Sequence, residues 1–151
     1  MVNYSNGKIY KIRSYQTDDV YIGSTTQTLS KRIGGHRTTY RQYLEGKNHY
    51  VTSYKIVAFE DAYIELVCLF PCNSKMELEK REGEEIRACV CVNKRIAGRT
   101  KKEYRADNRE KIQTYKKQYR KVKIECSICG FLGRKSDLKR HQRTKKCKSH
   151  L

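Results

Sequence analysis

The 151-residue sequence has no tryptophan, three phenylalanines and no long apolar segment. None of its apolar runs approaches the roughly 18 residues that a membrane-spanning helix needs. Its N-terminus also lacks the succession of basic, apolar and small residues that marks a secretory signal peptide. We therefore expect a soluble, intracellular protein that is not secreted and has no membrane partner.

Acidic residues are scarce in the C-terminal third of the chain. Residues 94–151 contain 5 of the 16 Asp and Glu residues but 21 of the 34 Lys and Arg residues, and so carry +16 of the net charge of +18. A polyanion is the natural partner of such a segment, and nucleic acid is the commonest one. A membrane surface is the alternative, but the segment lacks a large apolar face with Trp or Phe anchors.

The number of cysteines is odd, at seven. Without a secretory signal, metal binding or simple burial is favoured over disulfides. Four of them lie in apolar surroundings, where burial as small hydrophobic residues is favoured over a second metal site: Cys68, Cys72, Cys89 and Cys91.

Two short runs typical of β-strands lie near the N-terminus, at residues 8–12 and 20–24. The first contains Tyr10 and the second Tyr21. Turn-forming residues at 16–19 separate the runs, so the pattern predicts a β-hairpin. We expect the two tyrosines to project from neighbouring strands toward the same place.

A helical pattern follows the hairpin directly. Leu29, Arg32, Ile33 and His36 recur at spacings of three and four, which predicts a helix over about 27–46. This spacing puts Arg32 and His36 one turn apart on one face, beside the end of the second strand.

The segment from 49 to 90 supplies the remaining elements of the first domain. A near-continuous apolar run at 62–70 predicts a strand in the centre of the sheet. Before it, residues 49–58 are expected to form a short loop and then a helix that carries Tyr54, Ile56 and Val57, and a helix over about 74–89 follows it. The expected apolar stripe of the last helix consists of Met76, Leu78, Ile86 and Val90. The predicted fold class is α/β, with a small antiparallel three-stranded sheet flanked by helices.

The first 97 residues resemble the GIY-YIG nuclease family. The matching residues are Lys-Ile-Tyr at 8–10, Tyr-Ile-Gly at 21–23, Arg32, His36, Glu82 and Asn93. Each tripeptide alone is a weak signal, but their order and the polar residues that follow make a specific one. Lys8 stands where the family has its first glycine, a backbone position whose change is not expected to remove activity.

Hydrolysis of a phosphodiester needs groups that neutralise charge on phosphorus and stabilise the leaving oxygen. Glu82 is a hard oxygen ligand suited to Mg²⁺, or to Mn²⁺, with most of its waters retained. Arg32 offers a fork of donors that matches phosphate oxygens. Glu82 is favoured over Glu79 and Glu85 because Ile86 follows it by four residues, as in the family motif.

The resemblance also implies roles for the other matching residues. One of the two tyrosines would help to deprotonate the attacking water. We assign Tyr10 as general base and Tyr21 as the group that orients water and phosphate. Since a free tyrosine has a pKa near 10, Tyr10 needs help from the metal or from Arg32. His36 would support the phosphate or accept the proton instead, and Asn93 would be structural support.

Each of these residues also has an ordinary structural explanation. The chain has 12 tyrosines, and Tyr10 and Tyr21 could be plain strand aromatics. Arg32 and His36 could lie on a solvated helix face, and Glu82 is one of five glutamates within 77–85. The joint pattern in the family's order favours the catalytic interpretation.

Residues 98–123 form a predicted basic linker, within which 102–122 read as one helix. Ile112, Tyr115, Tyr119 and Val122 form a narrow apolar stripe on it. The simplest role is a spacer that follows the phosphate backbone, and the alternative is a solvated charged helix. The expected nucleic-acid contacts are Lys101, Lys102, Arg105, Arg109, Lys116, Lys117 and Arg120.

The last segment, 124–151, has the ligand pattern of a small metal module. Cys126 and Cys129 are followed by His141 and Cys147, which suits a four-coordinate structural Zn²⁺. The pattern resembles zinc fingers of the CCHC kind, and His150 is a substitute for the last ligand. So small a segment has almost no core, so zinc would hold it folded. The alternative is a disordered basic tail.

Side chains of this module are candidates for contacts with nucleic acid. If its helix begins near Lys135, then Arg134, Asp137 and Arg140 fall where DNA-binding fingers place their base-reading side chains. We expect nucleic-acid contacts from Arg134, Lys139 and Arg140. Phosphate clamping or protein binding are the alternatives.

These features predict three domains: a nuclease domain at 1–97, the linker at 98–123 and the finger at 124–151. The predicted function is a metal-dependent DNA endonuclease that acts on double-stranded DNA and has no small-molecule substrate. Such domain combinations resemble homing-type endonucleases and those of large DNA viruses, which would work in the host nucleus or cytoplasm. The alternatives are a nucleic-acid-binding protein without catalysis and a protein-interaction module.

Overall fold

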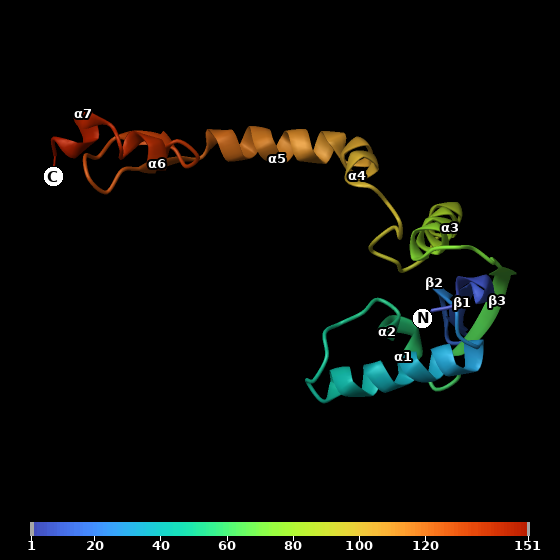
Figure 1. The fold of residues 1–151 in the computed structure, drawn as a ribbon. Coiled ribbons are helices and arrows are strands. Elements are labelled where there is room, and N and C mark those ends of the chain that lie inside the picture. The colour runs from blue at the N-terminus through green and yellow to red at the C-terminus, as the bar shows by residue number, and fades with distance from the viewer. Residues whose placement is uncertain (1, 151) are drawn as a thin grey trace. The chain divides into compact units, whose positions relative to one another are not determined.

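The computed structural model describes residues 2–150 and divides between Arg99 and Thr100 into two compact units. The first unit is an α/β structure built on a three-stranded antiparallel sheet in the order β2-β1-β3 (Figure 1). The strands are β1 (Lys8–Ser14), β2 (Thr17–Thr25) and β3 (Tyr63–Leu69). The predicted sheet and its hairpin are therefore confirmed.

The position of β3 corrects one prediction. The apolar run at 62–70 was expected to lie in the centre of the sheet, but β3 is an edge strand and β1 is central. Leu66 and Leu69 of β3 are exposed. An apolar run predicts a strand but not its neighbours. Here β1 takes the centre because it pairs along its length with both other strands, Tyr10 lying between Gly23 and Leu66.

The hairpin turn is tighter than predicted. Only Tyr15 and Gln16 separate β1 from β2, so three of the four expected turn residues belong to β2. The Asp61 carboxylate accepts hydrogen bonds from the Ser14 hydroxyl (2.7 Å) and from the backbone N–H of Tyr15 (2.9 Å). Gln16 donates its side-chain amide to the same carboxylate (3.0 Å). A residue distant in the sequence thus stabilises the turn, which local patterns cannot show.

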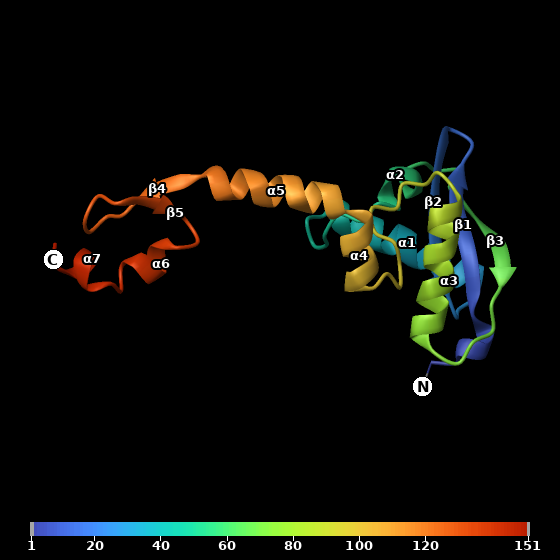
Figure 2. The same cartoon turned by 90° about the horizontal axis from the view of Figure 1, so that it is seen from above.

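Helices cover both faces of the sheet (Figures 1 and 2). They are η1 (Tyr4–Asn6), α1 (Leu29–Leu44), α2 (Tyr54–Val57) and α3 (Lys75–Ala88). Thr28 and Ser74 cap α1 and α3 by accepting backbone N–H groups of the first turn, as expected of such residues. No helix among residues 2–150 has the length and apolar character to cross a membrane.

Alternation along β1 creates two separate cores, one on each face of the sheet. Tyr10 and Ile12 pack with residues of α1 and α2, whereas Ile9 packs with Ile22 and with Leu78 and Ile86 of α3. Met76 and Val90, which were expected in the apolar stripe of α3, are exposed, Val90 to 97%. The stripe is therefore shorter than the sequence pattern predicted.

The second unit consists of two helices and a small module. Its elements are α4 (Lys101–Asp107), α5 (Arg109–Lys121), β4 (Lys123–Glu125), β5 (Leu132–Arg134), α6 (Leu138–His141) and α7 (Lys145–Lys148). The single helix predicted over 102–122 is wrong, because α4 ends at Asp107, α5 begins at Arg109 and Asn108 lies between them as the cap of both. The Asn108 side chain donates to the Tyr104 carbonyl (2.9 Å), a local bond typical of Asn that competes with helix continuation.

Tyr54 offers a test of packing in the first core. Its side chain is 3% exposed and its ring contacts those of Tyr40, Tyr43 and Tyr50, but its hydroxyl has no hydrogen-bond partner among residues 2–150. Tyr54→Phe should leave the free energy of unfolding unchanged or raise it by up to about 1 kcal/mol, because it removes an unpaired buried polar group. Tyr54→Ala should lower it by about 3–5 kcal/mol. Denaturant unfolding measures both, and a clear loss in Tyr54→Phe would contradict the packing described.

Candidate functional site

A buried hydrogen-bond chain joins β1 to α1. The Tyr10 hydroxyl accepts a hydrogen bond from Arg32 Nε (2.8 Å) and lies 2.9 Å from His36 Nε2. Since an arginine N–H can only donate, the Tyr10 oxygen accepts there, and it donates its own proton to His36 Nε2 when the neutral imidazole is in its Nδ1-protonated tautomer. His36 then carries its ring proton on Nδ1, which lies 3.2 Å from Ser53 Oγ. The predicted neighbours Tyr10, Arg32 and His36 are therefore brought together.

Gly23 makes room for this arrangement. It lies opposite Tyr10 in the β1–β2 ladder, and a Cβ at Gly23 would overlap the Tyr10 hydroxyl. A larger residue would displace the ring from Arg32 and His36. The space that the Tyr10 side chain occupies therefore explains why the third residue of the Tyr-Ile-Gly tripeptide is a glycine.

Burial controls the protonation of the chain. It raises the pKa of Tyr10, against the lowering effect of the Arg32 guanidinium, so the phenol is protonated at neutral pH. Burial lowers the pKa of His36 to about 4, and the charge of Arg32 acts in the same direction. Near pH 7 a neutral His36 can therefore accept the proton that Tyr10 presents.

Glu82 of α3 lies at the junction of two hollows. One, of about 370 Å³, is also lined by Arg32, and the other, of about 680 Å³, by Tyr21 and Asn93. The Ser24 hydroxyl donates to Glu82 Oε2 (2.6 Å). Burial raises the pKa of Glu82, with the charge of Glu79 acting in the same direction, while Ser24 and Arg32 lower it.

Tyr21 and Tyr10 differ in their access to these hollows. Tyr21 is partly exposed and lines the larger hollow, and its ring makes an edge contact with His36 (5.6 Å between centroids). Tyr10 is 0% exposed. Burial, followed by the charge of Glu82, raises the pKa of Tyr21, so this phenol is also protonated at neutral pH.

Asn93 clamps the segment after α3 onto the edge of β2. Its side-chain oxygen accepts the Ile22 N–H (2.9 Å), and its amide donates to the Ile22 carbonyl (2.8 Å). The Val92 N–H adds a hydrogen bond to the Val20 carbonyl (2.8 Å). The two Asn93 bonds pair the backbone groups of the residue between Tyr21 and Gly23.

Two serines in this site were missed by the sequence analysis. Ser24, the partner of Glu82, directly follows the Tyr-Ile-Gly tripeptide, and this position was the available signal. Ser53, the partner of His36, is fully buried, yet it lies in a polar stretch that gives no hint of burial.

The second unit contains a cluster of metal-binding side chains. One ligand atom from each of Cys126, Cys129, His141 and Cys147 lies within 4.8 Å of the others, so the group could hold a metal ion. Gly130 has a φ of +71°, a conformation that favours glycine, and its N–H bonds to the Cys126 carbonyl (2.9 Å). This turn brings Cys126 and Cys129 to the same side.

No second cluster of this kind occurs among residues 2–150. The four remaining cysteines pack against the core beneath α3, as favoured by the sequence analysis: Cys68, Cys72, Cys89 and Cys91.

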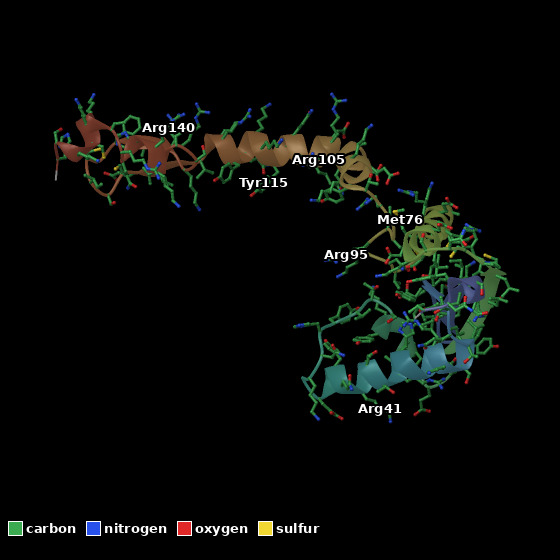
Figure 3. The ribbon with its side chains drawn as sticks, in the orientation of Figure 1. Arg41, Met76, Arg95, Arg105, Tyr115 and Arg140 are labelled. Carbon is green, nitrogen blue, oxygen red and sulfur yellow. The ribbon has the colours of Figure 1, made fainter. Side chains whose placement is uncertain are left out.

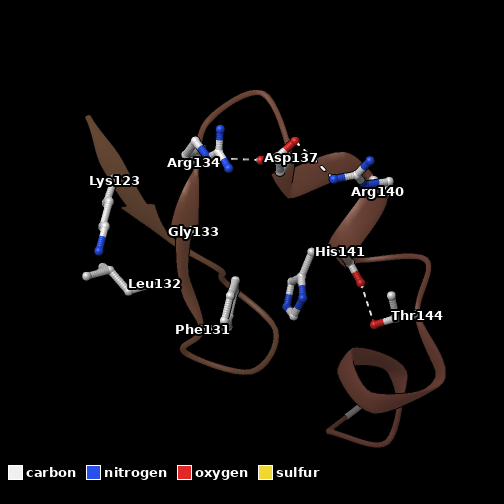
Figure 4. A pocket seen from close by; sticks show the side chains of 9 residues that line it. All are labelled: Lys123, Phe131, Leu132, Gly133, Arg134, Asp137, Arg140, His141 and Thr144. Carbon is white, nitrogen blue, oxygen red and sulfur yellow. Dashed lines mark hydrogen bonds and ion pairs between the residues drawn. The ribbon is translucent and has the colours of Figure 1, made fainter. Parts of the chain in front are cut away.

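A hollow of about 510 Å³ lies beside the cluster (Figure 4). The Phe131 ring stacks on His141 (4.5 Å between centroids), and Asp137 pairs with both Arg134 (3.4 Å) and Arg140 (3.3 Å). The helix α6 begins at Leu138 and not near Lys135, so Arg134 lies at the end of β5. The condition for the base-reading arrangement, a helix that begins near Lys135, is therefore not met, and Arg134 and Arg140 both pair with Asp137.

The basic side chains of the second unit that are predicted to contact nucleic acid are exposed. Figure 3 shows Arg105, Tyr115 and Arg140 projecting away from their ribbons. The same exposure holds for the other predicted contacts of this unit: Lys101, Lys102, Arg109, Lys116, Lys117, Arg120, Arg134 and Lys139.

Comparisons of the chain with protein-family models, with curated proteins and with solved structures gave no match. The resemblance to the GIY-YIG family therefore stays a prediction.

The pKa of His36 predicts a loss of stability in acid. The unfolded state, with a histidine pKa of 6.5, binds a proton that the folded state does not bind until about pH 4. The stabilisation is complete above pH 6.5 and is lost as the pH falls toward 4, by about 3 kcal/mol. Urea unfolding of the wild type and His36→Gln at several pH values measures it as the difference between them.

The exposed His49 supplies the matched control. His49→Gln should keep the pH dependence of the wild type. An equal acid sensitivity in the wild type and His36→Gln would show that His36 is not buried in its neutral form.

Proposed function

We propose that this chain is a metal-dependent endonuclease of the GIY-YIG type that hydrolyses phosphodiester bonds of double-stranded DNA. The observation that carries the proposal is the hydrogen-bond chain of Arg32, Tyr10 and His36, beside the carboxylate of Glu82. A buried tyrosine that presents its proton to a neutral imidazole is an arrangement suited to proton transfer.

Glu82 fits the role of metal ligand. Its carboxylate is partly buried, opens on two hollows and is anchored on one oxygen by Ser24. It would hold one Mg²⁺ or Mn²⁺ ion that keeps most of its waters. Such an ion would neutralise charge on the phosphate and stabilise the leaving oxygen.

Proton transfer from the attacking water would use Tyr10 as a relay. Tyr10 would take a proton from water while its own proton moves to His36 Nε2, so the phenol need not ionise despite its raised pKa. A bound phosphate would favour this step, because its negative charge raises the pKa of His36. Ser53 would hold the imidazole in the accepting tautomer.

The other residues would position the substrate. Arg32 uses Nε on Tyr10, and its terminal nitrogens would bind phosphate oxygens. Tyr21 lines the hollow and would orient the water, while Asn93 fixes the strand that carries it.

The basic second unit would tether the nuclease to DNA. Its exposed Lys and Arg side chains suit a polyanion, and its contacts would be mainly to phosphates. The cysteine and histidine cluster would hold a structural Zn²⁺, for which three thiolates and one imidazole are suitable ligands.

One observation favours the alternative of nucleic-acid binding without cleavage. Tyr10 is 0% exposed, as expected of a residue with a purely structural role. A non-catalytic protein with this fold would bind DNA through the same charges.

A cleavage assay tests the proposal. Full-length protein with Mg²⁺ should nick supercoiled plasmid, and Glu82→Ala should slow the reaction by about 100-fold or more, because the metal ligand is lost. Glu84→Ala, an exposed residue of the same helix, is the matched control and should cut like the wild type. A wild type that shifts the plasmid on a gel but never cuts it would support the binding alternative.

Cobalt binding tests the metal cluster. Co²⁺ added to reduced, metal-free protein should give the intense absorption of tetrahedral thiolate coordination at one equivalent, and Zn²⁺ should displace it. Cys147→Ala should weaken the absorption strongly, whereas Cys72→Ala, outside the cluster, should not. The assignment is wrong if Cys147→Ala and the wild type give the same spectrum.

A further inference from the structure

The larger hollow beside Glu82 has a wall that the proposed chemistry does not use. It is formed by residues 49–52, which precede α2, and by Lys94, Arg95 and Ala97, which follow α3. Tyr21 and Glu82 line the same hollow, so any molecule in it lies next to the candidate active site.

Tyr50 forms a fixed aromatic surface in this wall. Its ring makes edge contacts with Tyr43 (5.8 Å between centroids) and with the buried Tyr54 (6.0 Å), yet it is 46% exposed. Neighbouring rings restrict its motion, so a planar ligand would cost little side-chain entropy in binding to it.

The facing segment carries positive charge. The Lys94 ammonium lies over the Tyr50 ring, 5.7 Å from its centroid, and Arg95 projects from the same segment (Figure 3). Glu82 is the single acidic residue among those that line the hollow. An aromatic surface beside two cations suits a ligand that combines a flat ring with an anionic group.

We infer that this hollow binds the nucleotide next to the phosphate to be cut, with its base on Tyr50 and its phosphate on Lys94 and Arg95. The inference rests on the proposed function, because it takes the neighbouring phosphate to lie at Arg32 and Glu82. It adds a strand-positioning site, formed by residues 49–52 and 93–97, to the groups that carry out the reaction.

Photocrosslinking tests the inference independently of cleavage. The probe is a short duplex of alternating deoxyadenosine and 5-iododeoxyuridine, bound by the full-length protein in Ca²⁺ to keep the DNA intact. Irradiation should link iodouracil to Tyr50, identified by mass spectrometry of the digested complex. Tyr50→Leu should lose that link, whereas Tyr15→Leu, which alters an exposed tyrosine of the hairpin turn, should keep it.

Kinetics supply a second measurement if the protein cuts. Tyr50→Leu, and Lys94→Gln combined with Arg95→Gln, should each raise KM by about tenfold with kcat little changed, as expected for lost stacking or phosphate contacts. Unchanged KM in both variants would contradict the inference.

The outcomes separate this inference from the proposed function. A link at Tyr50 without any cleavage would support the nucleotide site and reject the nuclease. Cleavage by a protein whose bound duplex links only to residues outside 49–52 and 93–97 would support the nuclease and contradict the nucleotide site. Hydrogen exchange at 49–52 that slows with polyglutamate as strongly as with the duplex would indicate an acidic polypeptide ligand and overturn the inference.

Discussion

The hydrogen bonds of the Tyr10 hydroxyl join strand β1 to helix α1. The packing of the first unit and its candidate site both depend on this connection. The hydroxyl lies without exposure between β1 and α1, held by Arg32 and His36. A buried phenol is costly unless it is paired, so these bonds fix where α1 can lie on the sheet. Gly23 is required because the same hydroxyl fills the space of its missing Cβ. The fold and the candidate chemistry therefore share one set of atoms.

The sheet supports this site because β1 serves two cores. Tyr10 faces α1 and α2, whereas its neighbour Ile9 faces α3. Glu82 comes to the site from α3, at the hollows that open beside the β2 edge, and Ser24 of β2 anchors it. One strand pair thus holds side chains from opposite faces of the sheet in register. A shift of one residue in β1 would exchange the two faces and destroy both cores.

Exposed positive charge and buried neutral groups lie in different parts of the chain. Most of the positive charge lies beyond residue 93, on short helices and on a module whose cysteines and histidine form the candidate metal cluster. In the first unit, Lys94 and Arg95 lie beside the candidate site, whose inner groups are held neutral by burial, as the lowered pKa of His36 shows. Exposed charges suit a polyanion at long range, and buried neutral groups suit proton transfer.

The sequence by itself determined the elements and most of the site. Pattern and turn residues located the hairpin, α1 and α3, and spacing located the four metal-binding side chains and put Arg32 and His36 on one helix face. The family resemblance, and not spacing, predicted that Tyr10 joins Arg32 and His36. The tertiary structure decided the strand neighbours and the buried side-chain partners, which a local sequence pattern does not contain. It made β3 an edge strand, exposed Val90 and buried Ser53 against His36. The physical reason is that periodicity reports which residues prefer burial, whereas the partner of each strand or hydroxyl depends on segments distant in the sequence.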